Sequence, residues 1–305
     1  MMADSTRPTL DEWLSATTEE IASVVAPRHL GLMLSNDGTR RHYLIHTGKS
    51  QIDDFEDYTL HSAASHVRVY ECLFRLGVET ILSAMLYPPN FVRSPRYLRQ
   101  AVDSCSRLFL TGAFQGLYER CGVRARLYGD YDLAPLAAPV RTDLITLAER
   151  LREATPEGDH LLLYGFTAGS FVEEMIARTL ALKTATKKAP NEESLKRACF
   201  PEGPEQLDIL IDGGWMRVGS IVPPVLDRGK TDLYYLNHLS LDLSEETARR
   251  ILYDHLFLRW AGPEDDAVYE EADLAALRAY YQSVKPRVSG LGELVGPGVW
   301  YFSQG

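Results

Sequence analysis

The sequence predicts an α/β fold with a central, mostly parallel sheet flanked by helices. Short apolar runs of strand length alternate along the chain with longer stretches that carry apolar residues at helical spacing. Strands separated by helices of that length form βαβ units, and right-handed crossovers then place helices on both faces of the sheet. The 305 residues can bury a large core, and contents of 45% hydrophobic and 24% charged residues are ordinary for a globular protein.

Five strands are expected, at residues 29–35, 78–86, 123–128, 160–166 and 207–211. Helices are expected at 58–76, 95–120, 142–154 and 170–184, with a last one at 271–284 before a glycine-rich tail. Polar or turn-rich breaks fall at 186–193 and 262–266. The predicted organisation is an N-terminal extension (1–26), a catalytic domain (27–260), and a C-terminal helix and tail (261–305) that pack on the same domain.

Charge and cysteine content exclude several classes of protein. A net charge of −10 argues against a nucleic-acid surface, although it allows one local basic pocket. The four cysteines form no CxxC pair and are expected to be free thiols in a reducing compartment. The N-terminus lacks the features of a signal peptide, and no apolar run approaches about 18 residues. A cytoplasmic location is therefore expected.

In an open parallel sheet, the active crevice lies at the carboxyl ends of the strands. The first expected strand leads directly into the sequence Asn36-Asp37-Gly38-Thr39-Arg40-Arg41. Gly38 lets the backbone approach a ligand, Arg40 and Arg41 can fork onto phosphate oxygens, and Asp37 can hold Mg²⁺ or orient a donor. The alternative interpretation is a turn with two solvated arginines.

A second acidic cluster, Asp53-Asp54-Phe55-Glu56-Asp57, matches the DDxxD pattern with which all-helical terpene synthases hold Mg²⁺ on a diphosphate. An acidic helix start has the same letters, because carboxylates there favour the helix dipole. The alternation of strands and helices also contradicts an all-helical fold. Glu56 and Asp57 are therefore interpreted as a solvated helix start, and Asp53 and Asp54 as candidates for the rim of a pocket.

The sequence lacks the motifs of several other classes of enzyme. Gly229-Lys230-Thr231 resembles the end of a P-loop, but Pro224 stands where that loop needs a glycine. There is no GxSxG elbow, and no GxGxxG follows a strand. The eight histidines show no HExxH or other tight metal-ligand spacing, so no zinc site is expected. His61 and His66 are assigned to the surface or the core of a helix.

Residues 27–41 resemble the first signature block of undecaprenyl diphosphate synthases and other cis-prenyltransferases, a hydrophobic strand followed by Asp-Gly-Asn-Gly-Arg. Further matches to that family fall in the same order along the chain, at 77–83, 90–93, 128–130, 207–214 and 231–235. The resemblance is closer to a specialised branch, the tuberculosinol synthase-like diterpene enzymes. It extends from about residue 27 to the C-terminus, and includes a tail that ordinary members lack.

Two departures from the family pattern are informative. Chain-elongating members bind a second substrate, isopentenyl diphosphate, through the arginine of Ile-Arg-Thr and through Arg-x-Ser-Asn. Here the first position is Asp212 and the second block reads Arg217-Val218-Gly219-Ser220, and the family's Gly-His pair in the first helix is missing. The resemblance then implies a retained allylic diphosphate site and a lost or repurposed homoallylic site. Asp232 keeps a carboxylate where elongating enzymes have a Mg²⁺-associated glutamate.

The resemblance implies an enzyme that ionises an allylic diphosphate, with C20 diterpenyl diphosphates as the expected class, and releases diphosphate. Water or a small nucleophile such as adenosine would capture the carbocation. The implied diphosphate site comprises Arg40, Arg41 and Arg93 together with Gly38, Thr39 and Asn90, and the implied Mg²⁺ ligands are Asp37 and Asp232. Aromatic side chains could face the cation or simply pack in the core; these are Phe55, Tyr58 and Phe91.

Two other functions stay open. One is an irregular coupling or cyclising prenyltransferase that acts on short allylic diphosphates. The other is a non-catalytic partner subunit, against which the retention of Asp37, Arg40, Arg41 and Arg93 argues. The resemblance also implies a homodimer, with the helix expected at 249–260 as a candidate interface.

Overall fold

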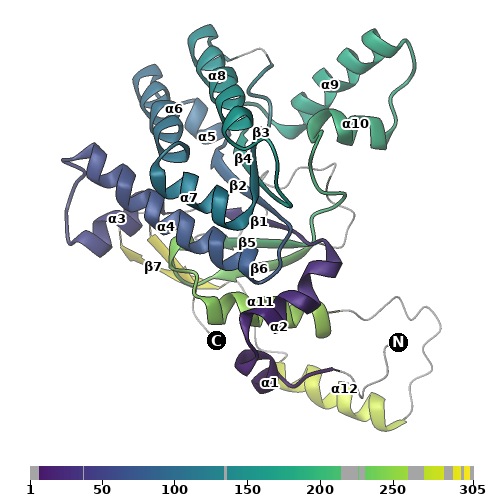
Figure 1. The fold of residues 1–305 in the computed structure, drawn as a ribbon. Helices are drawn as coiled ribbons and strands as arrows, with labels where there is room; N and C mark the ends of the chain where they lie inside the picture. The colour runs from purple at the N-terminus through teal and green to yellow at the C-terminus, as the bar shows by residue number, and fades with distance from the viewer. Residues whose placement is uncertain are drawn as a thin grey trace.

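A six-stranded, all-parallel sheet forms the centre of the computed structural model, in the order β3-β4-β2-β1-β5-β6 (Figure 1). The structure describes residues 7–36, 38–133, 136–213, 226, 231–259, 271–284, 291–296 and 299–302. The strands are β1 (Gly31–Ser35), β2 (Thr80–Leu86), β3 (Val123–Tyr128), β4 (His160–Phe166), β5 (Ile209–Gly213) and β6 (Asp232–Leu236). The predicted α/β class and all five predicted strands are confirmed, while β6 was not predicted as a strand.

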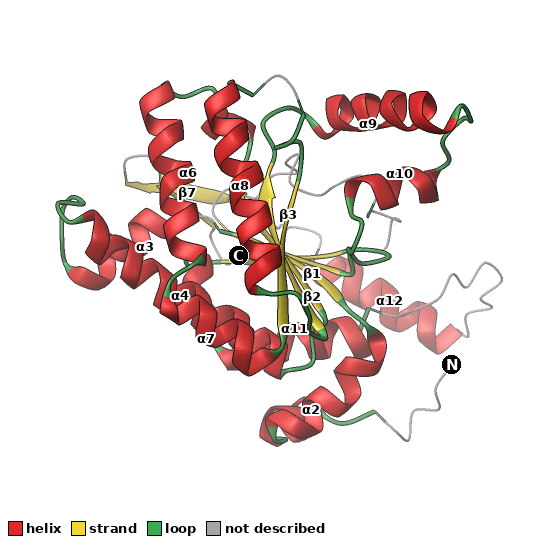
Figure 2. Cartoon of the chain, turned by 45° about the horizontal axis from the view of Figure 1, so that its top comes forward, coloured by secondary structure: helices red, strands yellow, loops and turns green. Residues whose placement is uncertain are grey.

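Helices cover both faces of the sheet, with α4, α6, α7 and α8 on one side and α9 and α10 on the other (Figure 2). The central helices are α3 (Thr39–Thr47), α4 (Phe55–Arg75), α5 (Pro88–Phe91), α6 (Pro95–Phe109), α7 (Gly112–Cys121), α8 (Ala138–Ala154), α9 (Phe171–Thr186) and α10 (Glu192–Cys199). The single helix predicted at 95–120 is in fact α6 and α7. The chain breaks there because Thr111 caps α7, accepting a hydrogen bond from the backbone N–H of Phe114.

Burial on both faces explains why the central strands have nearly continuous apolar sequences. All five residues of β1 are buried. Leu32 and Leu34 enter the larger core beneath α4, α6, α7 and α8, whereas Met33 enters a smaller core with Leu82, Leu163 and Phe200. The larger core includes a stacked pair, Phe109 and Tyr164, with ring centroids 3.7 Å apart.

The N-terminal extension packs against the last helix of the central domain. It forms α1 (Leu10–Ser15), α2 (Thr18–Val25) and a 3-10 turn, η1 (Ala26–Arg28), and α1 contacts α11 (Glu245–Phe257). Trp13 is buried there, and its Nε1 donates to the backbone oxygen of Arg249 at 2.8 Å. The Arg249 side chain is itself buried, and pairs with Glu245 at 2.6 Å. The helix expected at a dimer interface, 249–260, therefore uses Arg249 and its neighbours within its own chain, and Trp260 lies outside the described residues.

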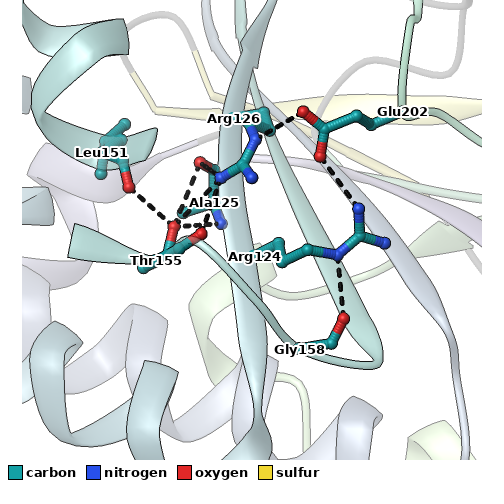
Figure 3. Close-up of polar contacts among 7 residues, drawn as sticks. All are labelled: Arg124, Ala125, Arg126, Leu151, Thr155, Gly158 and Glu202. Carbon is teal, nitrogen blue, oxygen red and sulfur yellow. Dashed lines mark hydrogen bonds and ion pairs between the residues drawn. The ribbon is translucent and has the colours of Figure 1, made fainter. Parts of the chain in front are cut away.

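A buried arginine network ties the edge strand β3 to the segment after α10 (Figure 3). Arg126 is nearly buried, and donates to the Glu202 carboxylate at 2.8 Å and to the backbone oxygen of Thr155 at 2.9 Å. Arg124 donates to the other Glu202 oxygen at 2.9 Å. Burial acts to raise the pKa of Glu202, but the two arginines outweigh it and lower that pKa. Glu202 thus fastens the α9–α10 hairpin to an otherwise open sheet edge.

The C-terminal region contains α12 (Glu271–Val284) and an antiparallel hairpin of β7 (Gly292–Gly296) and β8 (Val299–Phe302). The helix predicted at 271–284 is confirmed, and the hairpin was not anticipated. The division of the chain at residues 26 and 260 stays a prediction. None of the described helices has the length and apolarity needed to cross a membrane.

Candidate active site

The carboxyl end of β1 turns sharply into α3 at Gly38. Gly38 has φ = 81°, in the left-handed region that glycine tolerates best. A Cβ at this position would lie 2.6 Å from the Leu239 Cδ2 atom, so a side chain here would require the Leu239 side chain to shift. The positive φ is what favours glycine, and it forms the turn that places the next three residues at this edge of the sheet. Asp37 lies outside the described residues.

The N-terminus of α3 lies at the carboxyl edge of the sheet and has no side-chain cap among the described residues. The first helical hydrogen bond runs from the His42 N–H to the Gly38 oxygen, at 2.8 Å. The N–H groups of residues 39–41 consequently have no partner within the helix, and no side chain of the described residues caps them. Such a terminus attracts anions through its N–H groups and its dipole. The Thr39 hydroxyl bonds back to the Asn36 oxygen at 3.3 Å and helps to fix the turn.

Two predicted arginines project from the first turn of α3. Arg41 folds back against Gly38, where its Nη2 lies 3.3 Å from the position that a Cβ would occupy. Arg40 is exposed and approaches Tyr58 at the start of α4. Burial raises the pKa of Tyr58, Tyr97 adds to this rise, and the positive charge of Arg40 opposes it. Arg40, Tyr58 and Tyr97 therefore lie within electrostatic range of one another.

The third predicted arginine comes from the loop after β2. Arg93 is exposed, and its guanidinium carbon lies 4.7 Å from the ring centroid of Tyr97. Asn90 supports this arrangement because its Nδ2 donates to the Tyr97 hydroxyl at 3.3 Å, while its Oδ1 accepts from the Tyr87 N–H at 3.0 Å. Within the described part of the chain, neither Arg40 nor Arg93 has a carboxylate partner. Two guanidiniums without a carboxylate partner among the described residues thus lie around Tyr58 and Tyr97.

A polar network that the sequence reasoning missed lies beneath the β1–α3 turn. The Asn36 Nδ2 donates to the Ser83 hydroxyl at 2.6 Å, and that hydroxyl lies 2.5 Å from the Tyr70 hydroxyl. The Asn36 Oδ1 is buried and has no hydrogen-bond partner among the described residues. Burying an acceptor without a partner is costly. The Asn36 Oδ1 atom can therefore accept a hydrogen bond beside the predicted site. In the sequence, the position of Asn36 directly after the first strand was the one indication of this role.

The DDxxD sequence forms a helix start. Asp54 is the N-cap of α4, and its carboxylate accepts from the N–H groups of Glu56 and Asp57. The Asp57 carboxylate bonds to Lys49 and to the Tyr43 hydroxyl, each at 2.6 Å, and Asp53 accepts from the Gln51 amide. Phe55 is 46% exposed and its ring centroid lies 5.6 Å from that of Tyr58. The predicted helix start is confirmed, and the place of Asp53 and Asp54 at a pocket rim stays a prediction.

The pairing of Asp232 with Asp37 around one metal ion stays a prediction, because Asp37 lies outside the described residues. Asp232 is the first residue of β6. In the parallel register it lies beside Ile209 of β5, and Ile209 in turn lies beside Leu32 of β1. That is the amino end of the sheet, whereas residue 37 follows the carboxyl end of β1. Five residues of parallel strand span about 16 Å. Asp232 pairs with the His255 Nδ1 at 2.6 Å and the Arg259 Nη1 at 3.5 Å.

Two other family positions have clear roles in the structure. Asp212 is buried near the end of β5, at the same edge as the β1–α3 turn, and accepts from the Gly213 N–H at 2.8 Å. The loss of a second diphosphate site at this position stays a prediction. The Asp130 carboxylate accepts from the N–H groups of Ala168 and Gly169, at 2.5 and 2.7 Å. Asp130 therefore ties the exits of β3 and β4 together.

A histidine cluster lies on the other side of α3. His42 and His46 are one helical turn apart, and a single Asp242 oxygen lies 3.2 Å and 2.8 Å from their Nε2 atoms. The His61 Nε2 is 3.3 Å from the His42 Nδ1. These side chains form one of the groups in the described residues that could hold a metal ion, with His42, His46 and Asp242 as ligands. The four-residue spacing of His42 and His46 was the available sequence signal for this cluster, and whether it binds zinc is not tested by the structure.

Comparisons with known proteins agree with the resemblance found in the motifs. Tuberculosinyl adenosine transferase of Mycobacterium tuberculosis (strain CDC 1551 / Oshkosh) is 29% identical over 272 residues, which cover 87% of this chain and 88% of that protein. The (+)-kolavelool synthase of Herpetosiphon aurantiacus is 25% identical over 304 residues, 96% of this chain and 95% of that protein. Both relatives are named as enzymes, in agreement with the prediction of an enzyme. No family model matches the chain.

Solved structures support the same assignment of fold. Lavandulyl diphosphate synthase from Lavandula x intermedia, in complex with dimethylallyl diphosphate, aligns with a TM-score of 0.57 at 18% identity, over 76% of this chain and 96% of its own. A probable undecaprenyl diphosphate synthase from Campylobacter jejuni aligns with a TM-score of 0.52 at 17% identity, over 74% and 95%. The sequence-based recognition is confirmed, and the fold of this chain is that of the cis-prenyltransferase superfamily.

Proposed function

We propose that this chain ionises a C20 allylic diphosphate at the carboxyl edge of the sheet, releases diphosphate, and lets water or a small nucleophile capture the carbocation. The observation that carries this proposal is the start of α3, where the turn at Gly38 brings a helix N-terminus and two arginines to the end of β1. The two curated relatives support it, since one is named for a tuberculosinyl transfer and the other for kolavelool synthesis.

The diphosphate is bound by the first turn of α3, including Gly38 and Thr39, and by Arg40, Arg41 and Arg93. As the allylic C–O bond breaks, its electron pair leaves with the diphosphate, and negative charge grows on that group. Fixed positive groups and N–H donors stabilise the growing charge, and one such donor typically contributes about 10²–10³ in rate. The lack of a carboxylate partner for Arg40 and Arg93 among the described residues leaves both cations available to the ligand.

The carbocation is stabilised by aromatic side chains next to the arginines. Phe55 and Tyr58 share the first turn of α4, and Arg40 lies within electrostatic range of Tyr58. Placing the two rings beside the bound diphosphate exposes the new cation to their π faces, which is worth about 1–2 kcal/mol for each ring. Phe91 packs against the larger core instead, so its predicted role at the cation is less well supported.

The nucleophile is water or adenosine. One relative is named as an adenosine transferase, whereas the name of the other contains no acceptor. Asp37 follows the same strand as Asn36 and is proposed to orient the nucleophile or to hold Mg²⁺ on the diphosphate. Its predicted partner Asp232 starts β6 and pairs with His255. No step in this proposal requires a second protein carboxylate on the metal ion.

A product assay tests this function and separates it from the other two. The purified chain is incubated with C10 to C20 allylic diphosphates, with and without Mg²⁺ and adenosine, and the products are identified by mass spectrometry. A terpene alcohol or a terpenyl adenosine from a C20 diphosphate is expected. A larger product from dimethylallyl diphosphate alone would establish the coupling function instead. The absence of diphosphate release under every condition would leave the partner-subunit function.

The arginine clamp is tested by Arg40→Ala, with Arg150→Ala as the matched control. Arg40→Ala should lower the rate of diphosphate release by about 10²–10³, because one fixed cation at the leaving group is lost. Arg150 is an exposed arginine on α8, so its removal should leave the rate unchanged. Circular dichroism of both variants checks the fold. Wild-type turnover by a folded Arg40→Ala variant would show that the clamp is assigned wrongly.

The homodimer and the cytoplasmic location stay predictions. The helix at 249–260 stays the predicted interface, although α11 also packs against α1. Helix α9 carries an exposed apolar row one turn apart, Val172, Ile176 and Leu180, each at least 56% exposed. This row is proposed as a second candidate dimer surface.

A further inference from the structure

Four side chains from three separate segments converge beside the middle of α3. His42 and His46 come from α3, His61 comes from α4, and Asp242 comes from a 3-10 turn, η2 (Ser240–Asp242). The donor atoms of His42, His46 and Asp242 all lie within 4.8 Å of one another. The His42 side chain is 6% exposed, while those of Asp242 and His46 are 33% and 46% exposed. The cluster is therefore anchored in the protein and open to solvent on one side.

From this geometry we infer a binding site for a divalent transition metal ion, of which Zn²⁺ fits best, with His42, His46 and Asp242 as its ligands. Two imidazole nitrogens and one carboxylate oxygen are a common zinc ligand set, and a water molecule would complete the coordination on the exposed side. Ligand atoms of a tetrahedral zinc ion lie about 3.3 Å apart. The separations of 3.2 Å and 2.8 Å between the Asp242 oxygen and the two histidine nitrogens need only small changes to reach that geometry.

The carboxylate ligand is held in place before any ion binds. Arg68 of α4 donates hydrogen bonds to the backbone oxygens of Leu241 and Leu243, on either side of Asp242. This contact fixes η2 against α4 and directs Asp242 toward α3. On the helix, the spacing of four residues places His42 and His46 on one face. The three ligands are thus presented by backbone that other contacts already define, which lowers the entropic cost of binding an ion.

His61 acts as a positioning residue. When His42 binds the ion through Nε2, its Nδ1 carries a proton that points at the His61 Nε2, 3.3 Å away. Histidine ligands of zinc usually donate their second ring nitrogen in this way, and the partner fixes the orientation of the ring. His61 is therefore expected to act through His42, and to influence metal affinity less than a ligand does.

The ion would fasten α3 to η2. The same helix begins at Gly38 and carries Arg40 and Arg41 on its first turn. A bound ion therefore stabilises the helix that presents the diphosphate clamp, and this consequence alone rests on the proposed function. The metal site itself does not, because its ligands are separate from the clamp residues.

Metal binding is measured directly on chelator-treated, full-length protein. Titration with Zn²⁺ should give one ion per chain by calorimetry and by elemental analysis, and a hundredfold excess over Kd should raise Tm by about 3–5 °C. Co²⁺ in place of Zn²⁺ should give the visible absorption of a four-coordinate site. His46→Ala and Asp242→Asn, which alter solvent-accessible positions, should each weaken Zn²⁺ binding by more than about 100-fold, and His61→Gln by about 10-fold.

The control is His29→Asn. His29 is an exposed histidine paired with Glu79, its backbone is left-handed at φ = 52°, and asparagine tolerates that conformation. This variant should bind Zn²⁺ as the wild type does. No stoichiometric uptake by the wild type, or equal affinity in wild type and His46→Ala, would overturn the metal site. Neither result bears on diphosphate release, which is measured separately with Arg40→Ala.

Discussion

Acidification should destabilise this protein through His66, a histidine buried beneath the predicted site. The His66 ring has no solvent exposure, its Nδ1 lies 2.7 Å from the Ser62 oxygen, and its Nε2 has no partner among the described residues. Burial lowers the pKa of His66 from 6.5 to about 4. The ring is neutral in the folded state at neutral pH, and its Nδ1 then donates to Ser62.

The sign and size of the effect follow from this lowered pKa. Below pH 6.5 the unfolded chain protonates its histidine while the folded chain does not, so the free energy of unfolding falls as pH falls toward 4. A shift of 2.5 pKa units corresponds to about 3 kcal/mol in total, of which about 2 kcal/mol is lost by pH 5. Other groups also titrate in this range, so the wild type must be compared with a variant that lacks only this histidine.

His66→Leu is the appropriate variant. It removes a ring nitrogen that has no partner among the described residues and keeps an apolar side chain in the core. Urea unfolding at pH 7.5 and pH 5, followed by circular dichroism, gives the free energy of unfolding of each protein. Wild type should lose about 2 kcal/mol more than His66→Leu between the two pH values, and His29→Asn should behave as wild type does. An equal loss in wild type and His66→Leu would refute the assignment of a neutral, buried His66.

Two further predictions follow from contacts of the described residues. Asp232→Asn should leave the rate of diphosphate release within about twofold of wild type, whereas Asp37→Asn should lower it by about 100-fold, because only Asp37 follows the carboxyl end of β1. Steady-state assays of both variants decide this, and a large loss in folded Asp232→Asn would contradict the placement of Asp232. Glu202→Ala should lower the free energy of unfolding by about 2 kcal/mol in urea unfolding, because it leaves the nearly buried Arg126 without its carboxylate. The exposed Glu205, substituted in the same way, should change the free energy little, and equal effects would refute the role of Glu202.

The class of fold could be predicted from the sequence because the hydrophobic pattern of each strand and helix lies within a short segment of the chain. Burial on both faces of the sheet makes β1, β2 and β4 apolar along most of their length, and that pattern is visible without any tertiary information. β6 escaped prediction because its sequence, Asp-Leu-Tyr-Tyr-Leu, is only partly buried and includes a charged first residue. The break between α6 and α7 was missed because Thr111 is a weak signal between two apolar stretches.

The candidate site was predictable from the residues themselves where they follow one strand, and Asn90 and Arg93 came only from the family resemblance. Gly38, Arg40 and Arg41 follow one strand, so the rule on strand ends found them directly. The role of Asp232 stays a prediction, because a family motif gives its order along the chain and not the end of the strand at which it lies. Asp242 could not be linked to His46, since 196 residues separate them and only the folded chain brings their side chains to 2.8 Å.

We propose that Asp212, which stands where the resemblance implies an arginine, reduces the number of substrates without changing the fold. Asp212 lies one residue beyond Ile211, which pairs with Leu34 of β1, so its carboxylate belongs to the same edge as the β1–α3 turn. An ionised carboxylate about 4 Å from a phosphate oxygen opposes each unit of charge by about 4 kcal/mol at an effective dielectric constant of 20. That penalty corresponds to about a thousandfold loss of affinity for a second diphosphate. An allylic cation formed at the clamp would then meet water or a small neutral nucleophile rather than another isoprenoid diphosphate.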